Sequence, residues 1–265
     1  MKIGFIGAGN MGSAIIGGIL SNSIAAPSEL IVSDKNETAL ASLKEKYGIC
    51  TVSDNKECTL KADILFLCVK PNILYSVIDE IKNSVNEKTI FVSIAAGQSI
   101  EKMSAAFGKE DIKLIRVMPN TPALVGEGMA AVVPNCNVTE EETQTVLDIF
   151  SSFGKAEIVS ENLMDTVTAV SGSSPAYVFM FIEAMADAAV AGGMTRDKAY
   201  TFAAQAVLGS AKMVLETNMH PGALKDMVCS PGGTTIEAVK VLEEEGLRNA
   251  VIKAMKACEE KSKGL

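Results

Sequence analysis

The stretch KIGFIGAGNMGSA, residues 2–14, decides how the N-terminal half of this chain folds. A short apolar run, Ile3–Ile6, leads into the glycine pattern G-x-G-x-x-G at Gly7–Gly12, and a helical pattern follows it. In such a pattern the glycines permit a tight turn, a close approach of a diphosphate to the backbone, and close packing of helix on strand. The sequence therefore predicts a unit that binds a dinucleotide at a helix N-terminus; a glycine-rich turn without a ligand is the alternative.

Apolar runs alternate with helical patterns through residues 1–160. Strands are expected at 3–6, 30–33, 63–69, 89–94, 113–118, 129–133 and 156–159, and helices from the glycine loop through Leu20, over Glu37–Lys46, from Pro71, and over Ile100–Phe107 and Glu140–Ser152. Thr139 and Glu142 form a capping-box pattern ahead of the last of these helices. Continuous apolar strands are typical of a parallel sheet with helices on both faces. Residues 1–160 are therefore expected to form a Rossmann-type, doubly wound α/β domain that binds the dinucleotide.

The character of the sequence changes near Glu161, after which no further β-rich run occurs. Helices are expected over Leu163–Val170, Pro175–Ala191, Thr195–Leu215, Pro221–Val228 and from Thr235 to the end, with Gly246 as a candidate break. The apolar positions wrap around more of these helices than one short bundle can cover, which indicates burial against a second subunit. Residues 161–265 are therefore expected to form an all-α domain for substrate binding and dimerisation.

Composition excludes several classes of protein. The chain has 265 residues, 48% of them apolar and 21% charged, as in ordinary soluble globular proteins, and its net charge of −8 argues against binding to nucleic acid or anionic membranes. The apolar stretch Pro175–Met194 is interrupted by Glu183 and Asp187, which argues against a membrane span. The N-terminus enters a strand pattern at once, so a cytoplasmic protein is expected.

Cysteine and histidine usage predicts no metal site. The six cysteines form no C-x-x-C pair, and the chain has one histidine. Reduced, mostly buried thiols are expected. His220, which precedes Pro221, is interpreted as a turn or cap residue rather than a catalytic base.

The choice of dinucleotide depends on residues 33–36, SDKN, at the end of the second expected strand. An acidic side chain there binds the ribose 2′-hydroxyl, whereas a nearby cation accommodates a 2′-phosphate. If Ser33 and Lys35 face the pocket, strand alternation turns Asp34 away. This pattern favours NADP; NAD use stays open, and a solvated surface role is the alternative for Lys35.

A second glycine loop lies at residues 229–238, CSPGGTTIEA. Gly232 and Gly233 let backbone N–H groups converge, and Thr234 and Thr235 open a helix with its positive end. The combination predicts a cradle for a small carboxylate that carries a neighbouring polar atom. The alternative is a threonine that only caps a structural helix.

At this point the sequence resembles the pyrroline-5-carboxylate reductase family. The resemblance extends over essentially the whole chain, and its motifs occur in order. They are IGFIGAGNMG at 3–12, LFLCVKP at 65–71, SIAAG at 93–97, RVMPNTP at 116–122, SGSSPAYVF at 171–179 and HPGALKDMVCSPGGTTIEAVKVLEEEG at 220–246.

The resemblance implies an enzyme that reduces Δ1-pyrroline-5-carboxylate to L-proline with NAD(P)H, the last step of proline biosynthesis. It implies cofactor contacts by Ile6, Gly7, Ala8, Gly9, Asn10, Met11, Gly12, Ser33, Lys35, Asn55, Cys68, Val69, Lys70, Pro71, Ile94, Ala95, Ala96 and Asn120. It implies substrate contacts by Ser230, Gly232, Gly233, Thr234 and Thr235, with Glu161, Asp226 and Met227 as candidates for the pocket wall. Thr235 is the expected catalytic residue, with its hydroxyl directed to the ring nitrogen.

Asp34-Lys35 departs from the Asn-Arg of many relatives, so the expected cofactor is NADPH with NADH left open. The expected assembly is a homodimer or a higher homo-oligomer built from dimers.

The residue types suit this chemistry, because a protonated imine accepts a hydride without a nucleophile or a metal. The helix expected at Pro175–Ala191 contains no lysine or histidine, so alcohol oxidation lacks an obvious proton acceptor there. Two alternatives stay open. One is a reductase of a six-membered cyclic imine, since one methylene discriminates only weakly, and the other is a dinucleotide-binding regulator without turnover.

Overall fold

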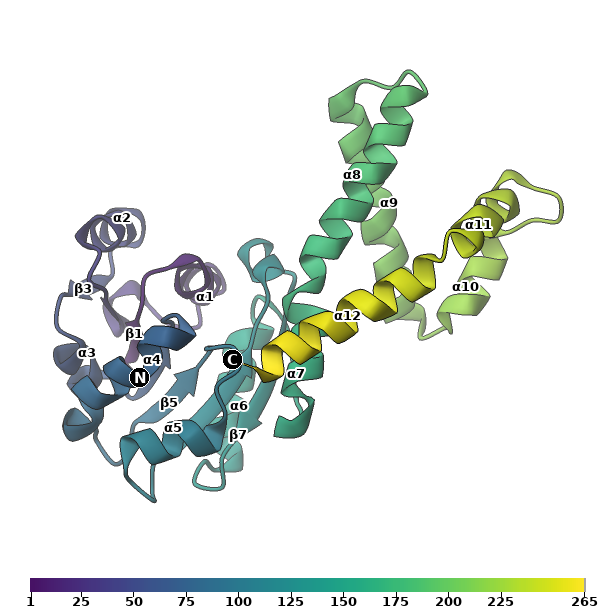
Figure 1. The fold of residues 1–265 in the computed structure, drawn as a ribbon. Coiled ribbons are helices and arrows are strands. Elements are labelled where there is room, and N and C mark those ends of the chain that lie inside the picture. The colour runs from purple at the N-terminus through teal and green to yellow at the C-terminus, as the bar shows by residue number, and fades with distance from the viewer. Residues whose placement is uncertain (265) are drawn as a thin grey trace. The chain divides into compact units, whose positions relative to one another are not determined.

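The structure is a computed structural model that describes residues 1–264, and it divides into two compact units (Figure 1). The first unit contains Met1–Ser173 together with the end of the last helix from Cys258 onward. The second unit contains Ser174–Ala257.

The first unit is built on an eight-stranded sheet in the order β3-β2-β1-β4-β5-β6-β7-β8. The strands are β1 (Ile3–Ile6), β2 (Leu30–Ser33), β3 (Cys50–Val52), β4 (Ile64–Leu67), β5 (Ile90–Ser93), β6 (Lys113–Met118), β7 (Gly128–Pro134) and β8 (Gly154–Ile158). Strands β1 to β6 pair in parallel, with β1 between β2 and β4. The chain therefore winds outward from β1 in both directions, as a doubly wound sheet requires.

Helices cover both faces of this sheet. They are α1 (Asn10–Ser21), α2 (Glu37–Tyr47), α3 (Asn55–Lys61), α4 (Pro71–Ile81), α5 (Ile100–Phe107), α6 (Glu140–Ser151) and α7 (Met164–Val167), with short 3-10 turns η1 (Pro27–Glu29), η2 (Lys82–Ser84), η3 (Thr121–Val125) and η4 (Glu161–Leu163) and a π-helical turn η5 (Thr168–Gly172).

The two largest hydrophobic cores lie on opposite faces of the sheet. On one face α1, α2 and α6 pack over Phe5 and Phe66, whose rings stack with centroids 4.8 Å apart. On the other face α4 and α5 pack over Phe91, whose ring centroid lies 4.7 Å from that of Phe107. The predicted α/β class with a Rossmann-type sheet is confirmed.

Two features of the sheet differ from the expectation. Strand β3 and helix α3 were not predicted, because CTV is too short and too exposed to stand out as an apolar run. Strand β7 pairs with β6 in the antiparallel sense. The segment between them contains only the 3-10 turn η3, which is too short for the crossover that a parallel partner needs.

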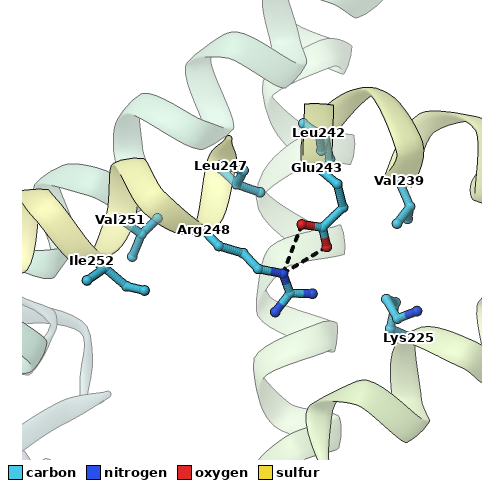
Figure 2. A pocket seen from close by; sticks show the side chains of 8 residues that line it. All are labelled: Lys225, Val239, Leu242, Glu243, Leu247, Arg248, Val251 and Ile252. Carbon is cyan, nitrogen blue, oxygen red and sulfur yellow. Dashed lines mark hydrogen bonds and ion pairs between the residues drawn. The ribbon is translucent and has the colours of Figure 1, made fainter. Parts of the chain in front are cut away.

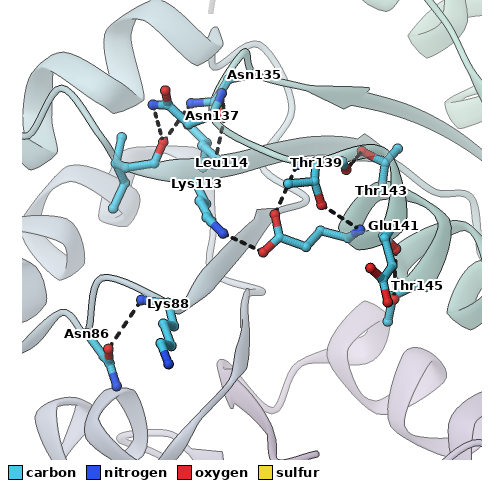
Figure 3. A network of polar contacts seen from close by, with 12 residues as sticks. Asn86, Lys88, Lys113, Leu114, Asn135, Asn137, Thr139, Glu141, Thr143 and Thr145 are labelled. Carbon is cyan, nitrogen blue, oxygen red and sulfur yellow. Dashed lines mark hydrogen bonds and ion pairs between the residues drawn. The ribbon is translucent and has the colours of Figure 1, made fainter.

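The start of α6 is held by the predicted capping box. The Thr139 N–H donates to Glu142 Oε2 at 3.0 Å, and the Glu142 N–H donates to Thr139 Oγ1 at 3.2 Å. Lys113 of β6 pairs with the same carboxylate, so the cap also ties the helix to the sheet (Figure 3).

The compact units divide between Ser173 and Ser174, whereas the change in sequence character predicts a domain boundary between residues 160 and 161. The intervening turns belong to the first unit, because Met164 is buried with Ala131 and Val133 of β7. The last helix, α12 (Leu247–Lys263), returns to this region, where Ser262 Oγ donates to Asp165 Oδ1 at 2.7 Å.

The second unit is helical. It contains α8 (Ser174–Ala191), α9 (Arg196–Thr217), α10 (Pro221–Val228), α11 (Thr234–Glu244) and the first part of α12, and Figure 1 shows α8 and α9 side by side as a hairpin. Gly246, at φ +75°, interrupts the helical conformation between α11 and α12, as expected.

Much of the apolar surface of the second unit is uncovered within one chain. In α8 only Ala186 is buried. Phe179 and Met180 of α8 and Phe202 of α9 are each more than half exposed. The helical stretch Glu161–Ala191 contains an 18-residue segment with a mean hydropathy of 1.2, so it would pass as a membrane span by length and composition alone. An apolar helix face of this extent also fits burial against a second subunit.

Packing of α1 against Phe153 predicts a difference between two neighbouring glycines. A Cβ added at Gly18 would lie 2.2 Å from the Phe153 ring, whereas one added at Gly17 would lie 3.0 Å from the Tyr47 hydroxyl, which can move. We expect Gly18→Ala to lower the free energy of unfolding by about 1–3 kcal/mol. We expect Gly17→Ala, the matched control, to leave it unchanged within about 1 kcal/mol. Urea unfolding measures both, and equal stabilities would contradict this packing.

Candidate active site

The first glycine loop has the backbone geometry that only glycine permits. Gly7 has φ +112°, and a Cβ there would lie 2.4 Å from the Cys68 carbonyl oxygen. A Cβ at Gly12 would lie 2.4 Å from the Gly7 carbonyl oxygen. The Gly7 N–H donates to the Ser33 carbonyl at 2.8 Å, which joins the loop to the end of β2. The loop is therefore fixed between β2 and β4.

Helix α1 begins at this loop and has no side-chain cap at its N-terminus. Its N-cap is Gly9, which has no side chain to accept the first helical N–H groups. A Cβ at Gly9 would meet no atom within 4 Å, so the space beside the helix N-terminus is open. A helix N-terminus of this kind binds phosphate through its unpaired N–H groups and its dipole.

A cavity of about 310 Å³ lies beside this loop and collects half of the predicted cofactor residues. Its lining contains the predicted residues Ile6, Gly7, Gly9, Ser33, Lys35, Asn55, Cys68, Val69 and Lys70, and also Asp34, Ile73 and Val77. The last three were missed. Ile73 and Val77 are four residues apart and share one face of α4, and the 42% exposure of Ile73 is explained by its place at the cavity.

Asp34 faces the cavity, and the prediction that it points away is wrong. Strand β2 ends at Ser33, so the alternation does not extend to Asp34. Its carboxylate accepts the Ala8 N–H at 2.6 Å and the Asn36 N–H at 2.7 Å. Asp34 thus lies beside two lysines of the same cavity, Lys35 and Lys70.

The other predicted cofactor residues lie along the carboxyl edge of the sheet. Ala8, Asn10, Met11 and Gly12 belong to the glycine loop and α1, Pro71 begins α4, and Ile94, Ala95 and Ala96 follow β5.

Asn120 follows β6 and is 9% exposed. Its amide nitrogen donates to the Ser171 hydroxyl at 3.2 Å and its amide oxygen accepts the Met129 N–H at 2.9 Å. These bonds hold η5 against the start of β7.

The six thiols are free, but they are less buried than expected. Cys58 is buried, Cys50 and Cys136 are exposed, and the other three are partly covered. Burial raises the pKa of the Cys58 thiol to about 12 and also raises the pKa of the Cys68 thiol at the cavity. Both thiols are therefore protonated at neutral pH and are poor nucleophiles.

The second glycine loop connects α10 to α11. Gly232 has φ +66°, and the Gly233 N–H donates to the Ser230 carbonyl at 3.0 Å, which closes a tight turn. The N-cap of α11 is Gly233, with no side-chain cap. Thr234 and Thr235 are the first two helical residues. Neither threonine therefore caps this helix, and both hydroxyls and the first N–H groups remain for a ligand.

The three candidates for the substrate-pocket wall belong to different units, Asp226 and Met227 to the second and Glu161 to the first. Asp226 pairs with Lys225 at 2.6 Å, and Met227 beside it is 66% exposed. Glu161 belongs to the first unit, where its carboxylate accepts the Ile100 N–H at 2.7 Å and an Arg116 N–H at 3.1 Å. Arg116 is itself buried, so this pair ties η4 to β6 and to the start of α5.

His220 is a helix cap, as the sequence predicted. Its Nδ1 accepts the Gly222 N–H at 3.1 Å at the start of α10. Within residues 1–264 no three His, Cys, Asp or Glu side chains gather into a group that could hold a metal ion.

A larger hollow, of about 510 Å³, lies in the second unit (Figure 2). It is lined mainly by the apolar side chains Val239, Leu242, Leu247, Val251 and Ile252, at whose edge Arg248 Nε donates to Glu243. Lys225 also lines this hollow, and the Arg248 and Glu243 side chains are paired with each other. The hollow belongs to the uncovered apolar surface described above.

The geometry therefore offers two anion cradles of the same design. Each consists of a glycine turn that opens a helix with unpaired N–H groups. The first adjoins a cavity with two lysines and suits a dinucleotide, and the second adds two hydroxyls and suits a small polar acid.

Two sequence profiles match the chain. The profile described as pyrroline-5-carboxylate reductase dimerisation matches residues 161–265. The profile described as NADP oxidoreductase, coenzyme F420-dependent, matches residues 2–97.

Relatives and solved structures of one family cover the whole chain. The pyrroline-5-carboxylate reductase of Escherichia coli K12 is 57% identical, over 100% of this chain and 98% of that protein. The one from Methanosarcina acetivorans is 48% identical, over 100% and 97%. The crystal structure of Plasmodium falciparum pyrroline carboxylate reductase with NADP bound has a TM-score of 0.90 at 36% identity and covers 100% of this chain and 97% of that chain. The Coxiella burnetii reductase has a TM-score of 0.91 at 35% identity, over 99% and 97%.

The two loop glycines Gly9 and Gly12 predict different effects of the same substitution. Gly12→Ala forces a methyl group against the Gly7 carbonyl, so we expect a lower Tm and loss of NADPH binding. Gly9→Ala adds a methyl group in open space that the diphosphate needs, so we expect an unchanged Tm and binding weaker by about tenfold or more. Thermal unfolding without cofactor and titration of NADPH fluorescence measure the two effects. Full NADPH affinity in Gly9→Ala would contradict this site.

Proposed function

The chain belongs to the pyrroline-5-carboxylate reductase family, and we propose how its residues carry out the reduction of Δ1-pyrroline-5-carboxylate to L-proline. The chain is an NADP-dependent oxidoreductase acting on a C=N bond, at the last step of proline biosynthesis. The proposed roles depend on one observation, namely that α1 and α11 both begin behind a glycine without a side-chain cap. One free helix N-terminus is assigned to each reactant.

The first loop is proposed to hold NADPH. The diphosphate is assigned to the N–H groups at Gly9, Asn10 and Met11, and Gly7 and Gly12 keep the loop clear of side chains. The adenosine end is assigned to Ser33, Lys35 and Asn55, and the nicotinamide end to Cys68, Val69, Lys70 and Pro71, with Ile94, Ala95, Ala96 and Asn120. NADH is proposed as an alternative cofactor, because the Asp34 carboxylate can accept a hydrogen bond from a ribose 2′-hydroxyl.

The second loop is proposed to hold the substrate. The backbone N–H groups of Gly233 and Thr234 are assigned to the carboxylate, and Ser230 and Gly232 shape the turn. Asp226 and Met227 remain proposed wall residues. Glu161 is a weaker candidate for that wall, because its carboxylate already binds Arg116 and the Ile100 N–H.

The reaction needs orientation more than acid or base catalysis. Bound NADPH supplies a hydride, one hydrogen with two electrons. The ring nitrogen of the substrate already carries a proton, so when the imine carbon accepts a hydride the π electron pair of the C=N bond becomes the lone pair of the nitrogen, and the products are L-proline and oxidised NADP. The residues of the chain must hold the ring carbon within about 3–3.5 Å of the hydride donor and exclude water.

Thr235 is the proposed catalytic residue. Its hydroxyl oxygen can accept the N–H of the protonated imine, which holds the ring in one orientation and stabilises the charged nitrogen. After reduction the same hydroxyl can hydrogen-bond to the product amine. The half-buried position of Thr235 in the first turn of α11 favours this role over a freely solvated one.

The chain forms homo-oligomers through the matched dimerisation segment, and we propose that the unit of assembly is a dimer. The more than half exposed Phe179, Met180 and Phe202 support this proposal. A cytoplasmic location is proposed as well, which the six free thiols support.

The direct test mixes the purified protein with NADPH and pyrroline-5-carboxylate and follows the loss of the nicotinamide absorbance. We expect turnover with NADPH and a lower rate with NADH. No loss of absorbance with either reduced cofactor would refute the proposed reaction.

Thr235→Ala is expected to lower kcat by about tenfold, the effect of one lost hydrogen bond to a charged group, while the Kd for NADPH is kept. Thr235→Ser is the matched control, because it keeps the hydroxyl, and we expect it to keep most of the activity. Steady-state kinetics with both variants make the measurement. Wild-type kcat in Thr235→Ala would show that the hydroxyl does not contact the reacting nitrogen.

A further inference from the structure

A chain of buried polar contacts runs from the first glycine loop to helix α4. The Gly7 N–H donates to the Ser33 carbonyl at 2.8 Å, and Ser33 Oγ donates to Asn55 Oδ1 at 2.7 Å. Asn55 Nδ2 then donates to Glu80 Oε2 at 2.9 Å. Ser33 is fully buried and Asn55 is 6% exposed, so neither side chain can exchange these partners freely with water.

The acid at the end of this chain determines which way the Asn55 amide faces. A carboxylate can only accept hydrogen bonds, so Glu80 requires the nitrogen end of the amide. The oxygen end is then turned to Ser33, whose hydroxyl supplies the proton. Without an acceptor at position 80 the amide could rotate by half a turn, with Ser33 accepting from the nitrogen end instead.

This orientation leaves one N–H of Asn55 without a partner in the part of the chain that the structure describes. Asn55 lines the same cavity as Lys35 and Lys70. An N–H donor beside lysines can bind a phosphate oxygen, which accepts hydrogen bonds, but it cannot accept the proton of a hydroxyl group.

We propose that Glu80 is a positioning residue for the cofactor, which locks Asn55 with an N–H donor toward the adenosine 2′-phosphate of NADPH. This inference rests on the proposed function only in placing the adenosine end of the cofactor at this cavity. Glu80 acts through Asn55 and does not touch the reacting atoms.

The negative charge of Glu80 works against the same phosphate, but it is the smaller effect. Glu80 is partly solvated, so its repulsion of a phosphate beyond Asn55 is screened by water and salt. A direct hydrogen bond from Asn55 to the phosphate is charge-assisted and depends on geometry. Loss of the orienting acceptor should therefore weaken binding of the 2′-phosphate.

The test measures binding of 2′,5′-ADP and of ADP by calorimetry, without turnover. We expect Glu80→Ala to weaken 2′,5′-ADP binding by about tenfold while ADP binding changes by less than about twofold. Glu80→Gln should restore 2′,5′-ADP binding, because its carbonyl still accepts from Asn55. Asp79→Ala is the control for charge on the same helix, since Asp79 is exposed and pairs with Lys82, and this variant should bind both ligands as the wild type does.

Three outcomes would overturn the proposal. They are unchanged 2′,5′-ADP binding in Glu80→Ala, equal weakening of both ligands, which indicates a merely structural role, and failure of Glu80→Gln to restore binding. If Glu80→Ala does not fold, Asn55→Asp decides, because it keeps the size of the side chain and removes both N–H donors. Wild-type 2′-phosphate selectivity in Asn55→Asp would refute the proposal. Reduction of pyrroline-5-carboxylate by the wild type is assayed separately, so failure of either proposal is recognised independently.

Discussion

Unpaired N–H groups at the start of two helices are the constraint on which the rest of this structure depends. Side chains satisfy such groups in α2, α3, α5 and α6, through Asn36, Asp54, Ser99 and Thr139. Helices α1 and α11 begin instead behind glycines. Helices α4, α7 and α9 also begin without a side-chain cap, but their N-cap residues are Lys70, Leu163 and Thr195 rather than glycine. Burial of the sheet on both faces, tight glycine turns and close contact with β4 all serve to hold the α1 terminus open.

Much of the fold could be predicted from the sequence, because its determinants are local. The glycine pattern, the continuous apolar strands and the capping box of Thr139 each reflect interactions between residues a few positions apart. The short, exposed strand β3 and the antiparallel direction of β7 could not be predicted from such local patterns. Their pairing is decided by a neighbour that lies far along the chain and by the length of the connection.

For the candidate site, the positions of the two glycine loops could be predicted from the sequence, but the orientation of several polar side chains could not. Glycines at 7, 9 and 12 and the cradle at 229–235 follow from backbone requirements, which residue types reveal. Asp34, Asn120 and Glu161 form hydrogen bonds with residues 26 to 61 positions away, such as Ala8, Ser171 and Ile100. A sequence pattern names a polar side chain, but only the folded chain shows whether its hydrogen bonds are already used.

The return of α12 to the first unit makes the second unit an insertion in the chain. The first unit receives residues from both ends of the sequence, since Cys258 and Ser262 contact Ser173 and Asp165. During synthesis, the first unit therefore gains the residues from Cys258 onward only after the whole second unit has been translated. A C-terminal truncation made to remove the helices of the second unit would also remove the end of α12, from Cys258 onward, from the first unit. An isolated first unit would have to be engineered with residues from both sides of the insertion joined by a new linker.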